Sequence, residues 1–241
     1  MSARIIVGVH GRPGNARSLD DIGRWAAGRG DGFLTYDQYG VNRPDCQRIP
    51  DDTLLDHLVA ELADVVGRVA PQSEVVLWGH SFGAMLCAHL LGRRPSALAR
   101  PVAAAVLSGF CPRRREFLDY NESRLRLSKA EFDRRHLCRA DPWPEAFARS
   151  MRAVPHGDVP LADDYDDVVR AIDVPVLLLR GEHDICSEAQ QREVTGLLRN
   201  AQAHAVTGAS HYLFVEDPDS TFAIADGFLG GLDTRPSGAA P

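Results

Sequence analysis

Apolar and polar positions follow one another along the chain in blocks that predict buried strands. Three apolar runs that contain or precede a glycine have the length of strands buried on both faces of a parallel sheet. They lie at 4–9, 75–78 and 174–180. Three weaker runs predict further strands at 32–38, 103–108 and 203–208.

Helical patterns separate these runs, at 18–28, 52–69, 83–93, 187–199 and 218–230. Strand and helix therefore alternate, which predicts an α/β fold: a mostly parallel sheet of about six strands with helices on both faces. A chain of 241 residues with 44% hydrophobic content can fill one sizeable core. We therefore expect a single domain over 1–241.

The alternation breaks once, because 111–172 separates two strands and carries helical patterns of its own. Ser128 and Glu131 have capping-box spacing, and Asp141 followed by Pro142 predicts another helix start. An apolar stripe at helical spacing follows, made of Leu161, Tyr165, Val168 and Ile172. A connection of this length predicts a helical lid inserted before the strand at 174–180. The segment 233–241 is predicted to be a flexible tail.

The stretch "VVLWGHSFGAMLCAHLL" at 75–91 places Ser81 between a predicted strand and a predicted helix. Gly79 and Gly83 give the room that a sharp strand-to-helix turn requires. A helix beginning near Phe82 directs free N–H groups and its positive dipole end toward developing negative charge. The pattern predicts that Ser81 is a nucleophile; the alternative is a buried strand that happens to end in glycine and serine.

A serine hydroxyl needs a neighbouring base, and an acid to orient that base. Among nine histidines, His211 in "TGASHYLFVEDP" lies in a loop after the last predicted strand, where it can reach over the strand ends. The strand at 174–180 is followed by "GEHD", which offers Asp184 and, as the alternative, Glu182. The order Ser81, Asp184, His211 is the one expected on a strand-to-helix elbow of this kind.

An oxyanion hole needs a second backbone donor besides the amide of Phe82. The turn "VGVHGRPG" at 7–14 ends the first predicted strand and offers the amide of Arg12, unless it is a simple loop. Apolar residues of the predicted lid either line an acyl pocket or only pack against the core: Phe117, Leu118, Phe132, Trp143, Phe147 and Met151.

Composition narrows the function classes. A net charge of -6 gives no overall basic field for nucleic acid, and no apolar run approaches the roughly 18 residues of a membrane span. Five cysteines at irregular spacing, without a Cys-x-x-Cys pair, predict reduced thiols and a cytoplasmic protein. Serine chemistry of this kind requires no metal and no organic cofactor.

With these motifs the chain resembles the α/β-hydrolase superfamily over essentially its whole length. "GHSFGA", "LRGEHD" and "GASHYLF" look more like the type II thioesterases of polyketide and non-ribosomal peptide synthesis, and "VLSGFCP", "LSKAEFDRR" and "LADDYDDV" are similar to their lid region. The resemblance implies that Ser81, Asp184 and His211 hydrolyse acyl thioesters on the phosphopantetheine arm of a carrier protein. "HGRPG" at 10–14 departs from that family's Pro-His-Ala-Gly-Gly turn and resembles esterases, peptidases and C–C bond hydrolases.

Residues 112–140 hold nine basic and five acidic side chains, an excess that either attracts an acidic carrier protein or is simply a solvated helical face. Other hypotheses stay open: a carboxylesterase or lactonase, a C–C hydrolase, an acyltransferase or cyclase, and a non-catalytic ligand-binding protein. The three intact candidate triad residues count against the last of these. The sequence leaves the oligomeric state open.

Overall fold

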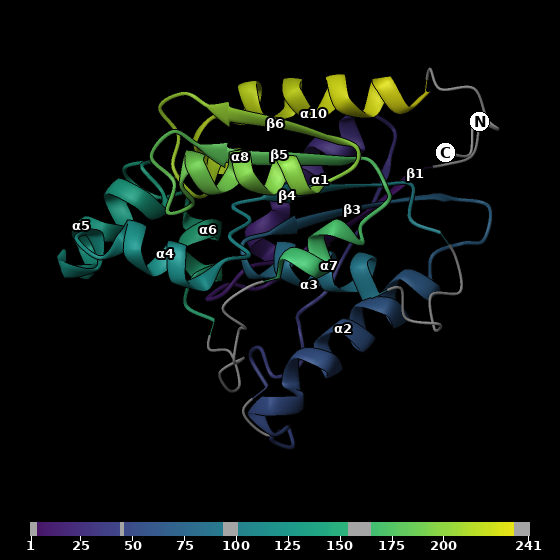
Figure 1. The fold of residues 1–241 in the computed structure, drawn as a ribbon, viewed down its shortest axis with the longest axis horizontal. Coiled ribbons are helices and arrows are strands. Elements are labelled where there is room, and N and C mark those ends of the chain that lie inside the picture. The colour runs from purple at the N-terminus through teal and green to yellow at the C-terminus, as the bar shows by residue number, and fades with distance from the viewer. Residues whose placement is uncertain (1–3, 44–45, 94–100, 154–164, 234–241) are drawn as a thin grey trace.

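The computed structural model describes residues 4–43, 46–93, 101–153 and 165–233. Its centre is one sheet of six strands in the order β2-β1-β3-β4-β5-β6 (Figure 1). All neighbouring strands pair in parallel. The strands are β1 (Arg4–Val9), β2 (Gly32–Thr35), β3 (Glu74–His80), β4 (Ala104–Ser108), β5 (Val176–Gly181) and β6 (Ala201–Val206). The six predicted strands are therefore confirmed.

Helices cover both faces of this sheet, as predicted. Successive side chains of a strand point to opposite faces, so Val75 and Leu77 of β3 join one core cluster while Val76 and Trp78 join the other. The helices packed in the first cluster are α2 (Asp51–Gly67), α3 (Phe82–Arg93), α7 (Asp166–Arg170) and α8 (Glu188–Leu197). Those packed in the second are α1 (Asp20–Gly28), preceded by the 3₁₀ turn η1 (Ala16–Leu19), α9 (Leu213–Glu216) and α10 (Pro218–Asp233).

The predicted lid emerges between β4 and β5 as short helices, which lie beyond the carboxyl ends of the strands, at the left of Figure 1. They are α4 (Arg114–Asn121), the 3₁₀ turn η2 (Arg124–Arg126), α5 (Lys129–Phe132), the π-helical turn η3 (Asp133–Leu137) and α6 (Glu145–Ser150). Ser128 caps α5 by accepting the N–H of Glu131, as predicted. The helix start predicted at Asp141 is wrong, because α6 begins after Pro144.

The last part of the insertion packs against the core. Tyr165, before α7, has its ring centroid 4.6 Å from that of His89 on α3, so the predicted apolar stripe faces α3. Leu161 of that stripe lies outside the described residues. The same holds for 234–241 of the predicted tail, whereas Asp233 ends α10 and its carboxylate pairs with Arg4 at 2.6 Å.

The cysteine prediction is wrong for two of the five thiols, because Cys111 and Cys186 form a disulfide. They are 75 residues apart in the sequence, but they follow the neighbouring strands β4 and β5, which brings their Cα atoms to 5.7 Å. Cys46, Cys87 and Cys138 remain free. Within the part of the chain that the structure describes, no helix combines the length and apolar character needed to cross a membrane.

Candidate active site

Ser81 occupies the turn between β3 and α3 with a backbone φ of +53°. This left-handed conformation is costly for a residue other than glycine and persists where the surroundings hold it. A Cβ atom on Gly79 would lie 2.6 Å from Cα of Ala84, and one on Gly83 would lie 2.0 Å from the carbonyl oxygen of Val9. The two flanking glycines therefore make the sharp turn possible, as the sequence predicts.

His211 and Asp184 lie together in the structure. The distance from Nδ1 of His211 to Oδ1 of Asp184 is 2.7 Å, and both side chains are buried. The Asp184 carboxylate also accepts the N–H groups of Cys186 (3.0 Å) and Gly181 (3.3 Å). An ionised carboxylate only accepts hydrogen bonds, so Nδ1 of His211 carries the hydrogen and Nε2 is left as the basic nitrogen.

The carboxylate of the alternative acid, Glu182, bonds the backbone of another loop. It accepts the N–H of Gly208 at 2.8 Å. Between the two carboxylates that the sequence left open, the structure therefore brings Asp184 against His211.

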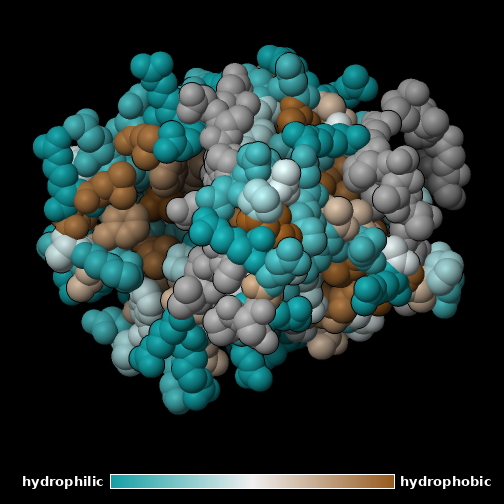
Figure 2. All heavy atoms as spheres, turned by 90° about the horizontal axis from the view of Figure 1, so that it is seen from below, coloured by the Kyte–Doolittle hydropathy of each residue, from teal (hydrophilic) through white to brown (hydrophobic). Residues whose placement is uncertain are grey.

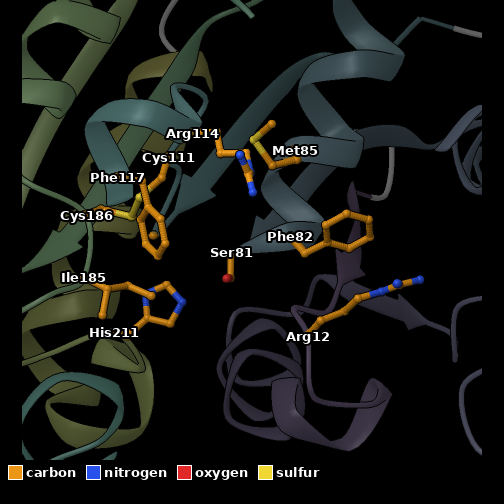
Figure 3. Close-up of a pocket in the computed structure, with 11 residues that line it drawn as sticks. Arg12, Ser81, Phe82, Met85, Cys111, Arg114, Phe117, Ile185, Cys186 and His211 are labelled. Atoms are coloured by element: carbon orange, nitrogen blue, oxygen red, sulfur yellow. A yellow bond between two sulfur atoms is a disulfide. The ribbon is translucent and has the colours of Figure 1, made fainter. Parts of the chain in front are cut away.

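Ser81 and His211 face the same space (Figure 3). Gly109, after β4, has a φ of +59°, and a Cβ atom there would lie 2.5 Å from Cε1 of His211. The backbone of Ser108 accepts the N–H of Ser81 at 2.8 Å. The end of β4 thus touches both candidate catalytic residues.

The two turns that carry the predicted oxyanion donors, Phe82 and Arg12, border Ser81. Phe82 is the first residue of α3, where an N–H group has no acceptor within the helix. A Cβ atom on Gly11 would lie 2.8 Å from Cβ of Ser81, so the turn after β1 contacts Ser81. The guanidinium of Arg12 lies 4.5 Å from the Phe82 ring centroid, and Figure 3 shows this side chain running along Phe82, away from Ser81.

Sequence reasoning missed the residue that holds this turn. His10 is buried; its Nδ1 donates to the carbonyl of Gly11 (2.9 Å) and its Nε2 accepts the backbone N–H of Gln38 (3.2 Å). The side-chain amide of Gln38 donates to the carbonyl of His10 at 2.5 Å. Burial lowers the pKa of His10, which keeps Nε2 free to accept. The sequence feature that could have indicated this role is a histidine that directly follows a predicted strand and precedes a glycine.

His80, next to Ser81 in the sequence, is buried, and its ring packs against that of His211. Its Nδ1 lies 3.1 Å from Oγ of Ser108, and its ring centroid is 4.7 Å from that of His211. Burial lowers the pKa of His80 well below its usual value, with the charges of His211 and His10 acting in the same direction. His80 is therefore neutral and adds no positive charge beside His211.

Two cavities meet at Ser81 and His211. The smaller, of about 230 Å³, reaches the Cys111–Cys186 bond and is here named the disulfide cavity. The larger, of about 600 Å³, extends under α5 and α6 and is named the lid cavity. Figure 2 shows hydrophobic side chains gathered around a hollow at the lid end of the molecule, at the left of that view.

Four of the six predicted pocket residues line these cavities. Phe117 lines the disulfide cavity, while Phe132, Trp143 and Met151 line the lid cavity. Leu118 and Phe147 belong to neither lining. Leu118 is 39% exposed, and Phe147 is buried with its ring 4.7 Å from that of Tyr212, so one faces outward and the other packs in the core.

Asp184, Cys186 and His211 also form a group whose ligand atoms lie within 4.8 Å of one another. The Cys186 sulfur is bonded to Cys111, and the other two residues bond each other. A metal here would need a thiolate that the disulfide removes. This donor set fits a hydrogen-bonded acid–base pair and does not fit a metal.

Two proline iminopeptidases are similar in sequence. The protein from Thermoplasma volcanium is 25% identical over 251 residues, covering 88% of this chain and 83% of that protein. The protein from Saccharolobus solfataricus is 34% identical over 89 residues, so the match spans 35% of this chain and only 27% of the relative's length. Neither is named as a thioesterase, and thioesterase activity is therefore a proposal for this chain.

The fold agrees with solved structures over nearly the whole chain. The crystal structure of VinJ superposes with a TM-score of 0.78 at 20% identity, covering 95% of this chain and 91% of that one. The family model described as "Alpha/beta hydrolase family" matches residues 6–224, which include the elbow and the loops of Asp184 and His211. The chain belongs to the alpha/beta hydrolase family.

Proposed function

We propose that this protein is a serine hydrolase that cleaves acyl thioesters through an acyl-enzyme intermediate on Ser81. The observation that carries the proposal is the 2.7 Å hydrogen bond between His211 and Asp184 beside a serine held at positive φ. Asp184 keeps the hydrogen on Nδ1, so Nε2 of His211 takes the Ser81 proton as the hydroxyl attacks the carbonyl carbon.

The remaining steps use the same groups. The amides of Phe82 and Arg12 stabilise the oxyanion, and His211 protonates the leaving thiol. A water molecule then gives a proton to His211 and attacks the acyl-enzyme, which releases a carboxylic acid and restores the Ser81 hydroxyl.

Charge near the site supports an acyl thioester over a cationic substrate. Arg12, Arg114, Lys129 and Arg152 line the two cavities, and Asp133 is the single acidic side chain in the described linings. Asp133 is paired with Lys129. The described linings therefore offer a protonated amine one carboxylate, which Lys129 already pairs, whereas a neutral or anionic substrate, such as a thioester on a phosphopantetheine arm, needs no carboxylate partner.

We propose that the acyl group reaches the site on a carrier protein, and ion pairs on the lid reduce the charge that would attract an acidic one. Within the described residues, four of the nine basic side chains in 112–140 make ion pairs that neutralise them, namely Arg113, Arg126, Lys129 and Arg135. The basic excess of the lid is thus reduced at its surface, and docking should depend more on the arm than on steering by charge.

Proline iminopeptidase activity is the second candidate, favoured by the 25% identity over 88% of the chain. A prolyl amide, whose ring amine is protonated at neutral pH, is the probe that distinguishes peptidase from thioesterase activity. Its positive charge meets no carboxylate in the disulfide cavity as described.

The experiment compares wild type with Ser81→Ala on four substrates: octanoyl-N-acetylcysteamine, octanoyl-phosphopantetheinyl carrier protein, p-nitrophenyl octanoate and prolyl-7-amido-4-methylcoumarin. We expect Ser81→Ala to lower kcat/KM on the thioesters by roughly 10⁴-fold or more. We also expect the thioester to exceed the matched oxygen ester. A preference for the prolyl amide would establish the second candidate instead, and equal rates for wild type and Ser81→Ala would refute both.

A further inference from the structure

One histidine of the lid bonds both loops that carry the proposed acid and base. The acid loop (182–187) follows β5, and the base loop (207–212) follows β6. Nδ1 of His136 lies 3.0 Å from the carbonyl oxygen of His183 in the acid loop. The backbone carbonyl of His136 accepts the N–H of His211 in the base loop at 3.1 Å. The side chain of His136 therefore holds one loop, and its backbone holds the other.

These contacts belong to a closed ring of hydrogen bonds. The N–H of His183 donates to the carbonyl of Ala209 at 2.9 Å, which joins the acid loop directly to the base loop. From Ala209 the chain continues to His211, whose N–H returns to His136. The hydrogen bond between Asp184 and His211 joins the same two loops. A shift of either loop away from the other therefore lengthens at least one hydrogen bond of the ring.

The π-helical turn η3 places the carbonyl groups of the lid at this position. The last carbonyl groups of a helix have no donor within it and need one outside. Besides the carbonyl of His136, which bonds His211, the carbonyl of Leu137 accepts the N–H of Tyr212 at 3.0 Å. Cys138, directly after the turn, is buried in the core. This end of the lid is therefore bonded to the base loop at two successive residues and anchored beside it.

The bond to the acid loop fixes the tautomer of His136. A carbonyl oxygen only accepts hydrogen bonds, so Nδ1 of His136 carries the hydrogen. Burial lowers the pKa of His136, and the bond to the His183 carbonyl opposes this shift. The charges of Arg124, Arg135 and His183 lower the pKa further. The imidazole is therefore neutral at neutral pH, with its hydrogen directed at the acid loop.

We propose that His136 is a positioning residue that joins the acid loop to the base loop and thereby keeps the Asp184–His211 pair aligned with Ser81. This inference rests on the proposed function, because it assumes that His211 is the base. His136 belongs to the described lining of neither cavity, so it acts through His211 and not on the substrate. It adds a residue of the lid to those that the reaction needs.

The test compares three variants on p-nitrophenyl acetate, a small ester that excludes any effect of carrier docking. His136→Leu keeps most of the side-chain volume and removes the donor. His136→Asn restores a donor, because its amide nitrogen is as many bonds from Cα as Nδ1 of histidine. Arg134→Ala, at an exposed residue of the same turn, is the matched control. Tm is recorded for each protein.

We expect His136→Leu to lower kcat roughly tenfold or more and to change KM less than about threefold, because the base moves while the cavities stay. Labelling of Ser81 by a fluorophosphonate should slow by a similar factor, since the label reacts with the same activated hydroxyl. His136→Asn should return kcat to within about threefold of wild type, and Arg134→Ala should keep the wild-type values.

Three results would refute the inference: wild-type kcat in His136→Leu, a change in KM alone, or an equal loss of kcat in His136→Leu and His136→Asn. The last result would show that the ring itself matters and not its hydrogen bond. In each case the proposed function stands if Ser81 is labelled in wild type and Ser81→Ala is inactive. Absence of both labelling and hydrolysis in wild type would overturn the proposed function together with the inference.

A measurement on wild type keeps the test decisive if His136→Leu does not fold. Nitrogen NMR of isotope-labelled imidazoles shows which ring nitrogen carries the hydrogen, and the signals of His136 are those absent from His136→Asn. The inference requires the hydrogen on Nδ1 of His136. A neutral ring with its hydrogen on Nε2 cannot donate to the His183 carbonyl from Nδ1 and would refute it.

Discussion

Single residues decide whether His211 can face Ser81. Gly109 has no side chain, and this absence gives the imidazole its space, because a Cβ atom there would lie 2.5 Å from Cε1 of His211. A misplacement of about 1 Å at a reacting group can cost about 10²-fold in rate. We therefore expect Gly109 to matter to the proposed reaction although it carries no reactive group.

Gly109→Ala should lower kcat/KM at least ~10²-fold while the protein stays folded. Gly208→Ala is the matched control, because Gly208 also has a positive φ (+74°) but no atom within 4 Å of an added Cβ. Both variants should lose stability through backbone strain, by roughly 1–3 kcal/mol. Steady-state kinetics with thermal unfolding of both variants checks this. Equal activity in the two variants would show that contact with His211 is not limiting.

The positions of Ser81, Asp184 and His211 could be predicted because each stands in a short string next to a predicted strand end. The roles of Gly109 and His10 could not be predicted from local patterns. Gly109 lies against the ring of His211, which is about a hundred residues further along the chain. His10 forms a hydrogen bond with Gln38, which follows the neighbouring strand β2. Such contacts depend on strand order, which apolar runs do not encode.

The loops after β4 and β5 act together because the disulfide joins them. Cys186 donates its N–H to the Asp184 carboxylate. The disulfide also ties Cys186 to Cys111, the first residue of the lid insertion, so the position of Asp184 is linked to the start of the lid. The sequence indicated both strands and the lid, but the adjacency of β4 and β5 made the bridge possible. The disulfide could not be predicted from the sequence, because the cysteines are odd in number and irregularly spaced.

Reduction of Cys111–Cys186, or the double variant Cys111→Ser/Cys186→Ser, should lower both Tm and kcat/KM. Closing a loop of 75 residues restricts the unfolded chain, and the bond is worth on the order of 2–4 kcal/mol. That corresponds to a Tm decrease of roughly 4–16 °C in a chain of this size. Cys46→Ser, at a free and partly exposed cysteine, is the control. Titration of five free thiols in the unreduced protein, or an unchanged Tm under reducing conditions, would contradict the prediction.

Across the whole molecule, folding places imidazoles in apolar surroundings on both sides of the sheet. Burial lowers the pKa of His10, His80 and His89. For His89, on α3, the lowering is to about 4, with desolvation as the main cause; the charge of Arg93 acts in the same direction and that of Asp56 opposes it. Neither ring nitrogen of His89 has a hydrogen-bond partner among the described residues, and its ring packs on Tyr165.

These lowered pKa values make the stability of the protein depend on pH in a defined direction. In the unfolded chain His89 takes up a proton below about pH 6.5, but in the folded protein it does so only below about pH 4. Between these values the unfolded state binds more protons, so acidification favours unfolding, and above about pH 7.5 the group has no effect. His89→Leu should therefore flatten the dependence of Tm on pH between 6.5 and 4, whatever its Tm at pH 8. The exposed His204, replaced by leucine, is the control for losing an imidazole. Scanning calorimetry of wild type and the two variants across this range measures the slope of Tm against pH. If the slope in His89→Leu is as steep as in wild type, the acid sensitivity belongs to other groups. His10 and His80 would then be the next residues to replace.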